Sequence, residues 1–201
     1  MPASDIDRLQ RSFYARNTLT VAREMLGQRL VRKLGAHRIA GRIVEVEAYV
    51  GEGDTACHAA RGRTARNAVM FGPAGHAYVY FIYGMHHCFN VVTEQEGYAA
   101  AVLVRALEPL EGLGSMRRHR GGRDGVELTN GPAKLCSALA IDRALNGADL
   151  VTSEEAWLER DALVGESDIA EGPRIGVHGD ERAQTVPWRF WVAGNPYVSG
   201  R

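Results

Sequence analysis

A carboxylate and an aromatic ring alternate along the segment that contains Glu45, Glu47 and Tyr49. Alternate side chains of an extended strand share one face, so we expect these three to be neighbours. A carboxylate that aromatic walls partly desolvate is a stronger base. These residue types therefore suit a pocket for a flat aromatic ring with one working carboxylate. An edge strand with two solvated glutamates is the alternative, and this strand taken alone favours it.

A second tyrosine-rich segment follows, in which Tyr78, Tyr80 and Ile82 share a face and Tyr83 has the opposite parity. Gly84 comes next and permits a bend that turns Tyr83 off the end of the strand. An aromatic side chain at such a turn can wedge between stacked bases and hold an extruded nucleotide out of a duplex. Core packing of an ordinary tyrosine-rich sheet is the alternative interpretation.

Metal-binding chemistry is suggested by Cys57-His58 and by His86-His87-Cys88, but neither stretch has the spacing of a zinc motif. The chain also lacks a phosphate-binding loop, a dinucleotide fingerprint and a nucleophile elbow. We therefore expect neither a metal nor an organic cofactor.

The elements that must position these residues predict an α+β fold. Strand patterns occupy residues 29–34, 38–50, 76–83, 88–93, 99–106 and 188–192, and helix patterns occupy residues 4–14, 18–26, 110–120 and 132–139. Because the strands are grouped in the middle of the chain, we expect an antiparallel sheet core with surrounding helices, in one domain over residues 1–201. The long segment 51–75 is expected to be a functional loop.

Charge is balanced overall and uneven locally. With 201 residues and 45% hydrophobic composition the chain can bury one core, and its formal net charge is zero. A nucleic-acid interaction must therefore depend on local charge. Lys33 and Lys134 are the only lysines, so nearly all basic residues are arginines, which suit bidentate phosphate contacts. The arginine-rich clusters comprise Arg61, Arg63, Arg66, Arg117, Arg118, His119, Arg120 and Arg123.

Targeting signals are not evident. No apolar run is long enough for a membrane span, and the N-terminal residues lack the basic start and apolar middle of a signal peptide. The three cysteines are scattered and odd in number, which is typical of a reducing compartment. We therefore expect a cytoplasmic protein that is neither secreted nor bound to a membrane.

Several long, uncommon strings occur in one order along the chain. They are Glu47-Ala48-Tyr49, the loop 53–71 with His58 and Arg66-Asn67, the run 78–85, Asn90, and the runs 104–112 and 130–136. Together they closely resemble the alkyladenine (3-methyladenine) DNA glycosylases of the methylpurine type, over roughly residues 22–199. Around residues 175–179 the chain is slightly shorter than the family pattern, which leaves open how its last loop closes against the pocket.

The resemblance implies hydrolysis of the N-glycosidic bond of alkylated or deaminated purines in double-stranded DNA after base flipping. It covers 3-methyladenine, 7-methylguanine, ethenoadenine and hypoxanthine, and the product is an abasic site. Glu47 matches the general base, and Arg105 matches the arginine that positions the attacking water. The remaining matches are Tyr49, His58 and Tyr80 as walls around the flipped base, Asn90 as the residue that crowds the amine of guanine, Tyr83 as the intercalating residue, and Arg63, Arg66 and Met85 at the DNA backbone.

Lysine usage bears on whether such an enzyme also cuts the DNA strand. A glycosylase that is also a lyase forms a Schiff base through an amine. Lys33 and Lys134 lie outside the strings that would line the pocket, so water is the expected nucleophile. The amine of Pro2, exposed if Met1 is removed, keeps a bifunctional glycosylase/lyase open as an alternative.

Two further functions remain open. A catalytically silent lesion-binding module would flip damaged bases without cutting them, although the presence of Glu47 disfavours it. An enzyme of free nucleosides would share the carboxylate and the aromatic walls but would need neither Tyr83 as a wedge nor the arginine clusters. We expect a monomer, because nothing in the sequence indicates a symmetric interface.

Overall fold

Strand β2 (His37–Tyr49) runs through the middle of the molecule, and the rest of the fold is arranged around it. The computed structural model describes residues 7–200. The order of the main path is β3-β4-β5-β2-β1-β6, with β7 and β8 attached through β2, and every pairing is antiparallel. The other strands are β1 (Arg29–Leu34), β3 (Ala77–Ile82), β4 (His86–Val92), β5 (Ala101–Glu111), β6 (Ala156–Glu159), β7 (Ile169–Gly172) and β8 (Arg189–Val192). The predicted α+β class is confirmed.

Strand β2 changes partners along its length. Its first half pairs with β1, and residues 45–47 pair with β8, while β5 lies along its other edge nearly throughout. Both edges of the segment that carries the two glutamates are therefore covered. Val46 and Ala48 belong to the main core, as their parity predicts, and Glu45 and Glu47 on the other face are also fully buried. The solvated edge strand is thus excluded.

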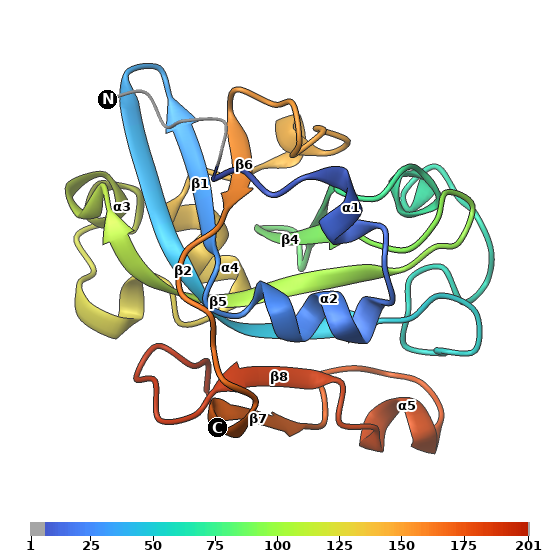
Figure 1. The fold of residues 1–201 in the computed structure, drawn as a ribbon. Helices are drawn as coiled ribbons and strands as arrows, with labels where there is room; N and C mark the ends of the chain where they lie inside the picture. The colour runs from blue at the N-terminus through green and yellow to red at the C-terminus, as the bar shows by residue number, and fades with distance from the viewer. Residues whose placement is uncertain (1–6, 201) are drawn as a thin grey trace.

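Helices cover both faces of the sheet, as predicted. They are α1 (Arg11–Tyr14), α2 (Thr18–Met25), α3 (Leu113–His119), α4 (Pro132–Ala138) and α5 (Glu181–Thr185). Helix α2 packs against β2 and β5, whereas α4 packs against β4 and β5, and Figure 1 shows the two helices on opposite sides of the sheet. Strands β7 and β8 lie together along one side, next to α5.

Two predicted boundaries were wrong for a shared reason, namely pairing to distant strands. Strand β5 continues to Glu111, because its last residues pair with β2 as far as Ala40, so the following helix begins only at Leu113. The predicted helix 4–14 is reduced to α1, since Arg8 forms an isolated bridge with Glu159; residues 4–6 lie outside the described part. Strands β6 and β7 and helix α5 were missed, as each is five residues or shorter.

The turn between β3 and β4 is tighter than predicted. Residues 84–87 were expected to be a turn, but β4 already begins at His86, which pairs with Ile82. Only three residues therefore connect the two strands, and Tyr83 is the first of them.

Residues 7–200 show no disulfide, no cluster of metal ligands and no membrane-spanning helix. Cys57, Cys88 and Cys136 are free and buried. Within the described range no three metal-binding side chains gather as an ion would require. None of the helices described is both long and apolar enough to span a membrane.

Candidate active site

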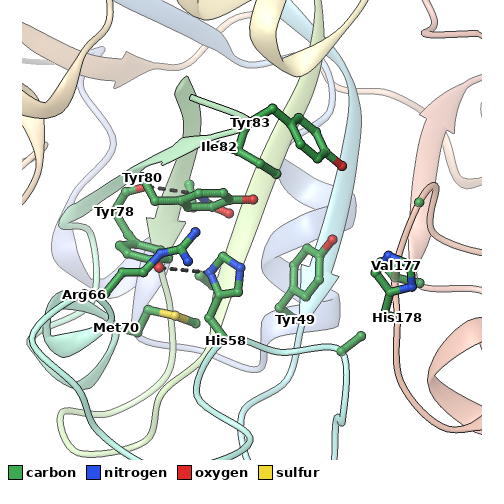
Figure 2. Close-up of a pocket in the computed structure, with 14 residues that line it drawn as sticks. Tyr49, His58, Arg66, Met70, Tyr78, Tyr80, Ile82, Tyr83, Val177 and His178 are labelled. Atoms are coloured by element: carbon green, nitrogen blue, oxygen red, sulfur yellow. Dashed lines mark hydrogen bonds between the residues drawn. The ribbon is translucent and has the colours of Figure 1, made fainter. Parts of the chain in front are cut away.

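A cavity of about 420 Å³ opens beside the tyrosine-rich strand, and we call it the aromatic pocket. Its walls come from the end of β2, the loop 51–75, the β3–β4 hairpin and the segment that follows β7. The lining residues are Tyr49, Ala56, His58, Arg66, Met70, Tyr78, Tyr80, Ile82, Tyr83, Asn90, Ala101, Gly176, Val177 and His178. Figure 2 shows Tyr49 facing His58 and Tyr80 across this space. The long loop therefore contributes directly to the pocket.

One side of the aromatic pocket is a packed group of rings. The hydroxyl of Tyr78 and Nδ1 of His58 are 2.9 Å apart, and the His58 and Tyr80 rings meet edge to face with centroids 4.5 Å apart. Burial raises the pKa of Tyr78 to about 12, so its hydroxyl stays protonated at neutral pH. Burial, together with the nearby Arg66 guanidinium, lowers the pKa of His58 below its usual 6.5. This side therefore presents uncharged aromatic surfaces at neutral pH.

The titration of His58 tests this arrangement. Arg66→Gln is expected to raise the pKa of His58 towards, but not fully to, 6.5, because partial desolvation of the ring remains the larger cause. NMR titration of the imidazole signals measures this directly. Arg61→Gln, which removes an equal charge from the same loop, is the control and should shift the pKa of His58 less. An unchanged His58 titration in Arg66→Gln would mean that the guanidinium is distant in solution.

Glu47 is fully buried behind the wall that Tyr49 forms. Its Oε2 accepts a hydrogen bond of 2.8 Å from the Tyr49 hydroxyl, and its Oε1 accepts one of 2.7 Å from the Ile175 amide. Nη1 of Arg105 lies 2.9 Å from the same Oε1. Glu47 does not line the cavity itself and reaches its wall through the Tyr49 hydroxyl.

Arg105 joins the two glutamates of β2. Its Nε donates to Oε1 of Glu45 at 3.0 Å, while its Nη1 pairs with Glu47. Desolvation alone would lower the pKa of Arg105, but Glu47 and Glu45 raise it above its usual value. Glu45 also accepts from the Ser199 amide at 2.6 Å and from Arg189 at 3.2 Å. Glu45 is therefore enclosed, and Arg105 is held in one orientation towards Glu47.

A second buried ion pair lies on the other side of Tyr49. Nη1 and Nη2 of Arg174 donate to the two carboxylate oxygens of Asp54 at 2.6 and 2.8 Å, and both side chains are completely buried. The Arg174 guanidinium lies 4.7 Å from the Tyr49 ring centroid and 5.2 Å from that of Trp188. This pair connects the loop 51–75 to the segment after β7, and the sequence analysis did not identify it.

Tyr83 stands at the tip of the β3–β4 hairpin and is 80% exposed. Its φ is +54°, which is unfavourable for a residue with a side chain, and Gly84 continues with a φ of +69°. The predicted bend is confirmed. Met85 beside it is 69% exposed and lies outside the aromatic pocket. An exposed ring held on strained backbone is typical of a functional position.

Asn90 and the arginines of the loop are placed differently. Asn90 is buried in the pocket lining and donates through its side-chain amide to the Tyr78 carbonyl at 3.0 Å. Arg66 lines the aromatic pocket, with its guanidinium 5.5 Å from the Tyr80 ring centroid. Arg63 packs instead near Phe71, outside the pocket lining. Asn90 and Arg66 thus belong to the pocket and Arg63 to its surroundings.

Charge near the pocket remains uncompensated within residues 7–200. Acidic residues at and just after the end of β6 form ion pairs with other arginines. For example, Glu159 pairs with Arg38 and Asp161 pairs with Arg42. In contrast, neither Arg63 nor Arg66 forms an ion pair with any described acidic residue. A neutral chain can therefore present local positive charge around the aromatic pocket.

The structure brings most of the predicted site residues together. Tyr49, His58, Tyr80, Asn90, Tyr83 and Arg66 line one cavity, and Glu47 and Arg105 lie directly behind it. Sequence reasoning placed Glu45 beside Glu47 but gave it no role, and it missed Asp54, Arg174, Ser199 and the Ile175 amide. The parity of Glu45 with Glu47 was a usable signal for Glu45. The others carry none, because their contacts depend on the distant C-terminal segment.

Comparison with known proteins identifies the family. The family model described as methylpurine-DNA glycosylase (MPG) matches residues 12–196. A protein of Methanocella arvoryzae named "Putative 3-methyladenine DNA glycosylase" is 54% identical over 96% of both chains. A protein of Carboxydothermus hydrogenoformans with the same name is 51% identical over 95% of this chain and 98% of its own. The chain therefore belongs to the methylpurine-DNA glycosylase family and is a hydrolase of N-glycosyl bonds in DNA.

Proposed function

We propose that the protein is a monofunctional glycosylase that excises alkylated and deaminated purines from double-stranded DNA after base flipping. The observation that carries the proposal is the buried Glu47–Arg105 pair behind an aromatic-walled cavity, with an exposed tyrosine at the cavity's edge. The names of the relatives support a purine substrate.

The cavity suits a flat base. A purine between Tyr49 and the His58–Tyr80 group is held by stacking, and an electron-poor or cationic purine also gains cation–π attraction. Extruding a nucleotide costs a few kcal/mol, and least where damage has weakened the base pair, so selection starts before the base enters the cavity. Asn90 in the lining adds a polar group that normal guanine must fit against.

The buried carboxylate suits activation of water. Glu47 accepts the proton of the attacking water, while Arg105 fixes the carboxylate and the water position. The negative charge of Glu47 also stabilises the positive charge that develops on the sugar as the bond to the base breaks. The water oxygen bonds to the sugar carbon, the base leaves with the bonding electrons, and an abasic site remains.

Water is also favoured as the nucleophile by the positions of the lysines. Lys33 lies on β1, and Lys134 on α4 is engaged by Glu127 and Asn130, so neither lines the aromatic pocket. The amine of Pro2 lies outside the described residues.

Single-turnover excision on short duplexes with hypoxanthine, ethenoadenine or 7-methylguanine tests the proposal. The expected result is base release, with strand cleavage only after alkali treatment. Cleavage before alkali, together with a borohydride-trapped adduct, would show a lyase. Tight binding of damaged duplex without any base release would show a lesion-binding module. Activity on free nucleosides alone, without salt-dependent duplex affinity, would show a nucleoside enzyme.

Removal of the Tyr83 ring is expected to weaken the complex between the protein and DNA with an extruded nucleotide. Tyr83→Ala keeps the hairpin but loses a stacking ring, which is worth about 1–3 kcal/mol per base. Fluorescence of a 2-aminopurine placed next to the lesion measures extrusion, and titration measures affinity. Phe81→Ala is the control, because it removes another partly exposed ring from the same hairpin. Equal losses in the two variants would contradict the specific role of Tyr83.

A further inference from the structure

Tyr49 has a permanent cation behind it. The Arg174 guanidinium lies 4.7 Å from its ring centroid, and neither Arg174 nor Asp54 lines the aromatic pocket, whereas Tyr49 does. The ring therefore separates the guanidinium from the cavity. Because both members of the Arg174–Asp54 pair are completely buried, solvent screens neither charge, and the Asp54 carboxylate is the counter-charge of the guanidinium.

Arg174 is also held through both of its terminal nitrogens. Besides its two bonds to Asp54, it donates to the carbonyl of Ala48 at 3.0 Å and to that of Ala183 at 2.9 Å. Ala48 directly precedes Tyr49, and Ile175, which directly follows Arg174, donates its amide to Glu47. The guanidinium thus holds the ring of the pocket wall and the carboxylate behind it in one framework.

We propose that Arg174 is a positioning residue that acts through Tyr49 to set the selectivity of the aromatic pocket between cationic and neutral purines. This inference rests on the proposed function. A cationic base on the cavity side of Tyr49 and the guanidinium on the other side compete for the same π electrons, because each polarises the ring towards itself. A neutral base does not enter this competition. Arg174 therefore lowers the affinity for cationic alkylated purines relative to neutral ones such as hypoxanthine.

Two variants separate the effect of the guanidinium from that of its counter-charge. Arg174→Met with Asp54→Asn removes both members of the pair and leaves an apolar chain against Tyr49. Asp54→Asn alone keeps the guanidinium but removes its counter-charge. The measured quantity is the ratio of half-saturating enzyme concentrations for matched duplexes with 7-methylguanine, which is cationic, and hypoxanthine, which is neutral, under single-turnover conditions.

Preference for 7-methylguanine over hypoxanthine is expected to rise about tenfold in the double variant and to fall in Asp54→Asn. Arg174→Lys keeps the positive charge but loses the paired N–H donors of the guanidinium. It should leave the preference for 7-methylguanine over hypoxanthine near that of the wild type. Circular dichroism verifies folding. Should Asp54→Asn fail to fold because it leaves a buried cation unpaired, the double variant, which leaves no unpaired charge, still gives the deciding ratio.

Equal weakening for both lesions in the folded variants, with the ratio unchanged, would overturn the inference and leave Arg174 as a structural residue. In that case the wild type still excises both lesions, and the proposed function stands. If the wild type excises neither lesion, both the proposed function and this inference are wrong.

Discussion

Glu47→Gln is expected to lower the single-turnover rate of hypoxanthine excision by about 10²–10⁴-fold, the range for loss of a general base. Glutamine has nearly the same shape and can keep the contact with the Ile175 amide, but it cannot take a proton from water. Affinity for the damaged duplex should therefore change little. Quenched-flow or hand-mixed time courses with excess enzyme give the rate, and titration with the same duplex gives the affinity.

Glu45→Gln is the matched comparison, because it removes the other carboxylate from the same Arg105 on the same face of β2. Glu45 is enclosed by Ser199 and Arg189 and has no contact with the wall of the aromatic pocket. Its loss should reduce stability more than chemistry. If Glu45→Gln lost as much excision rate as Glu47→Gln while remaining folded, the assignment of Glu47 as the base would be wrong.

Arg105→Gln is expected to cause a large loss of stability, about 3–5 kcal/mol, because it leaves buried Glu47 without its cation and Glu45 with Arg189 alone. The free energy of unfolding from urea titration measures this effect, and excision should fall with it as Glu47 loses its fixed orientation. Arg105→Lys should recover part of the stability, because the positive charge remains. Recovery should be incomplete, because an ammonium group cannot bond both glutamates as the guanidinium does.

Arg63→Gln provides the control for this measurement, because Arg63 is exposed and pairs with no described acidic residue. A surface substitution of this kind usually changes stability by about 0.5 kcal/mol or less. An Arg105→Gln protein as stable as Arg63→Gln would mean that the carboxylates are solvated or protonated in solution, and the buried pair would then be absent.

Local pattern was sufficient for the parts of the site that lie on one strand. Period-two alternation placed Glu47 and Tyr49 on a common face, and they form a hydrogen bond of 2.8 Å. The parity of Tyr83 and the following Gly84 predicted the bend at the hairpin tip, where both have positive φ. These predictions succeeded because strand geometry and glycine stereochemistry act over a few residues.

Burial of the glutamates could not be read from the strand itself. Two glutamates in an alternating segment are consistent with a solvated edge, and only the pairing of residues 45–47 with β8 makes that segment internal. Likewise, Arg174 lies in a short glycine-containing stretch with no periodicity, and its partner Asp54 is far away in the sequence. Such contacts depend on the tertiary arrangement, which single-sequence patterns do not encode.

The exchange of partners along β2 has a consequence for biosynthesis. Glu45 and Glu47 are synthesised early, but three of the groups that hold them, Ile175, Arg189 and Ser199, follow only 128 to 154 residues later in the chain. Strands β1 to β6 can pair before then, because none of their pairings involves residues beyond 160. The sheet can therefore form before the C-terminal contacts that complete the enclosure of the two carboxylates are available.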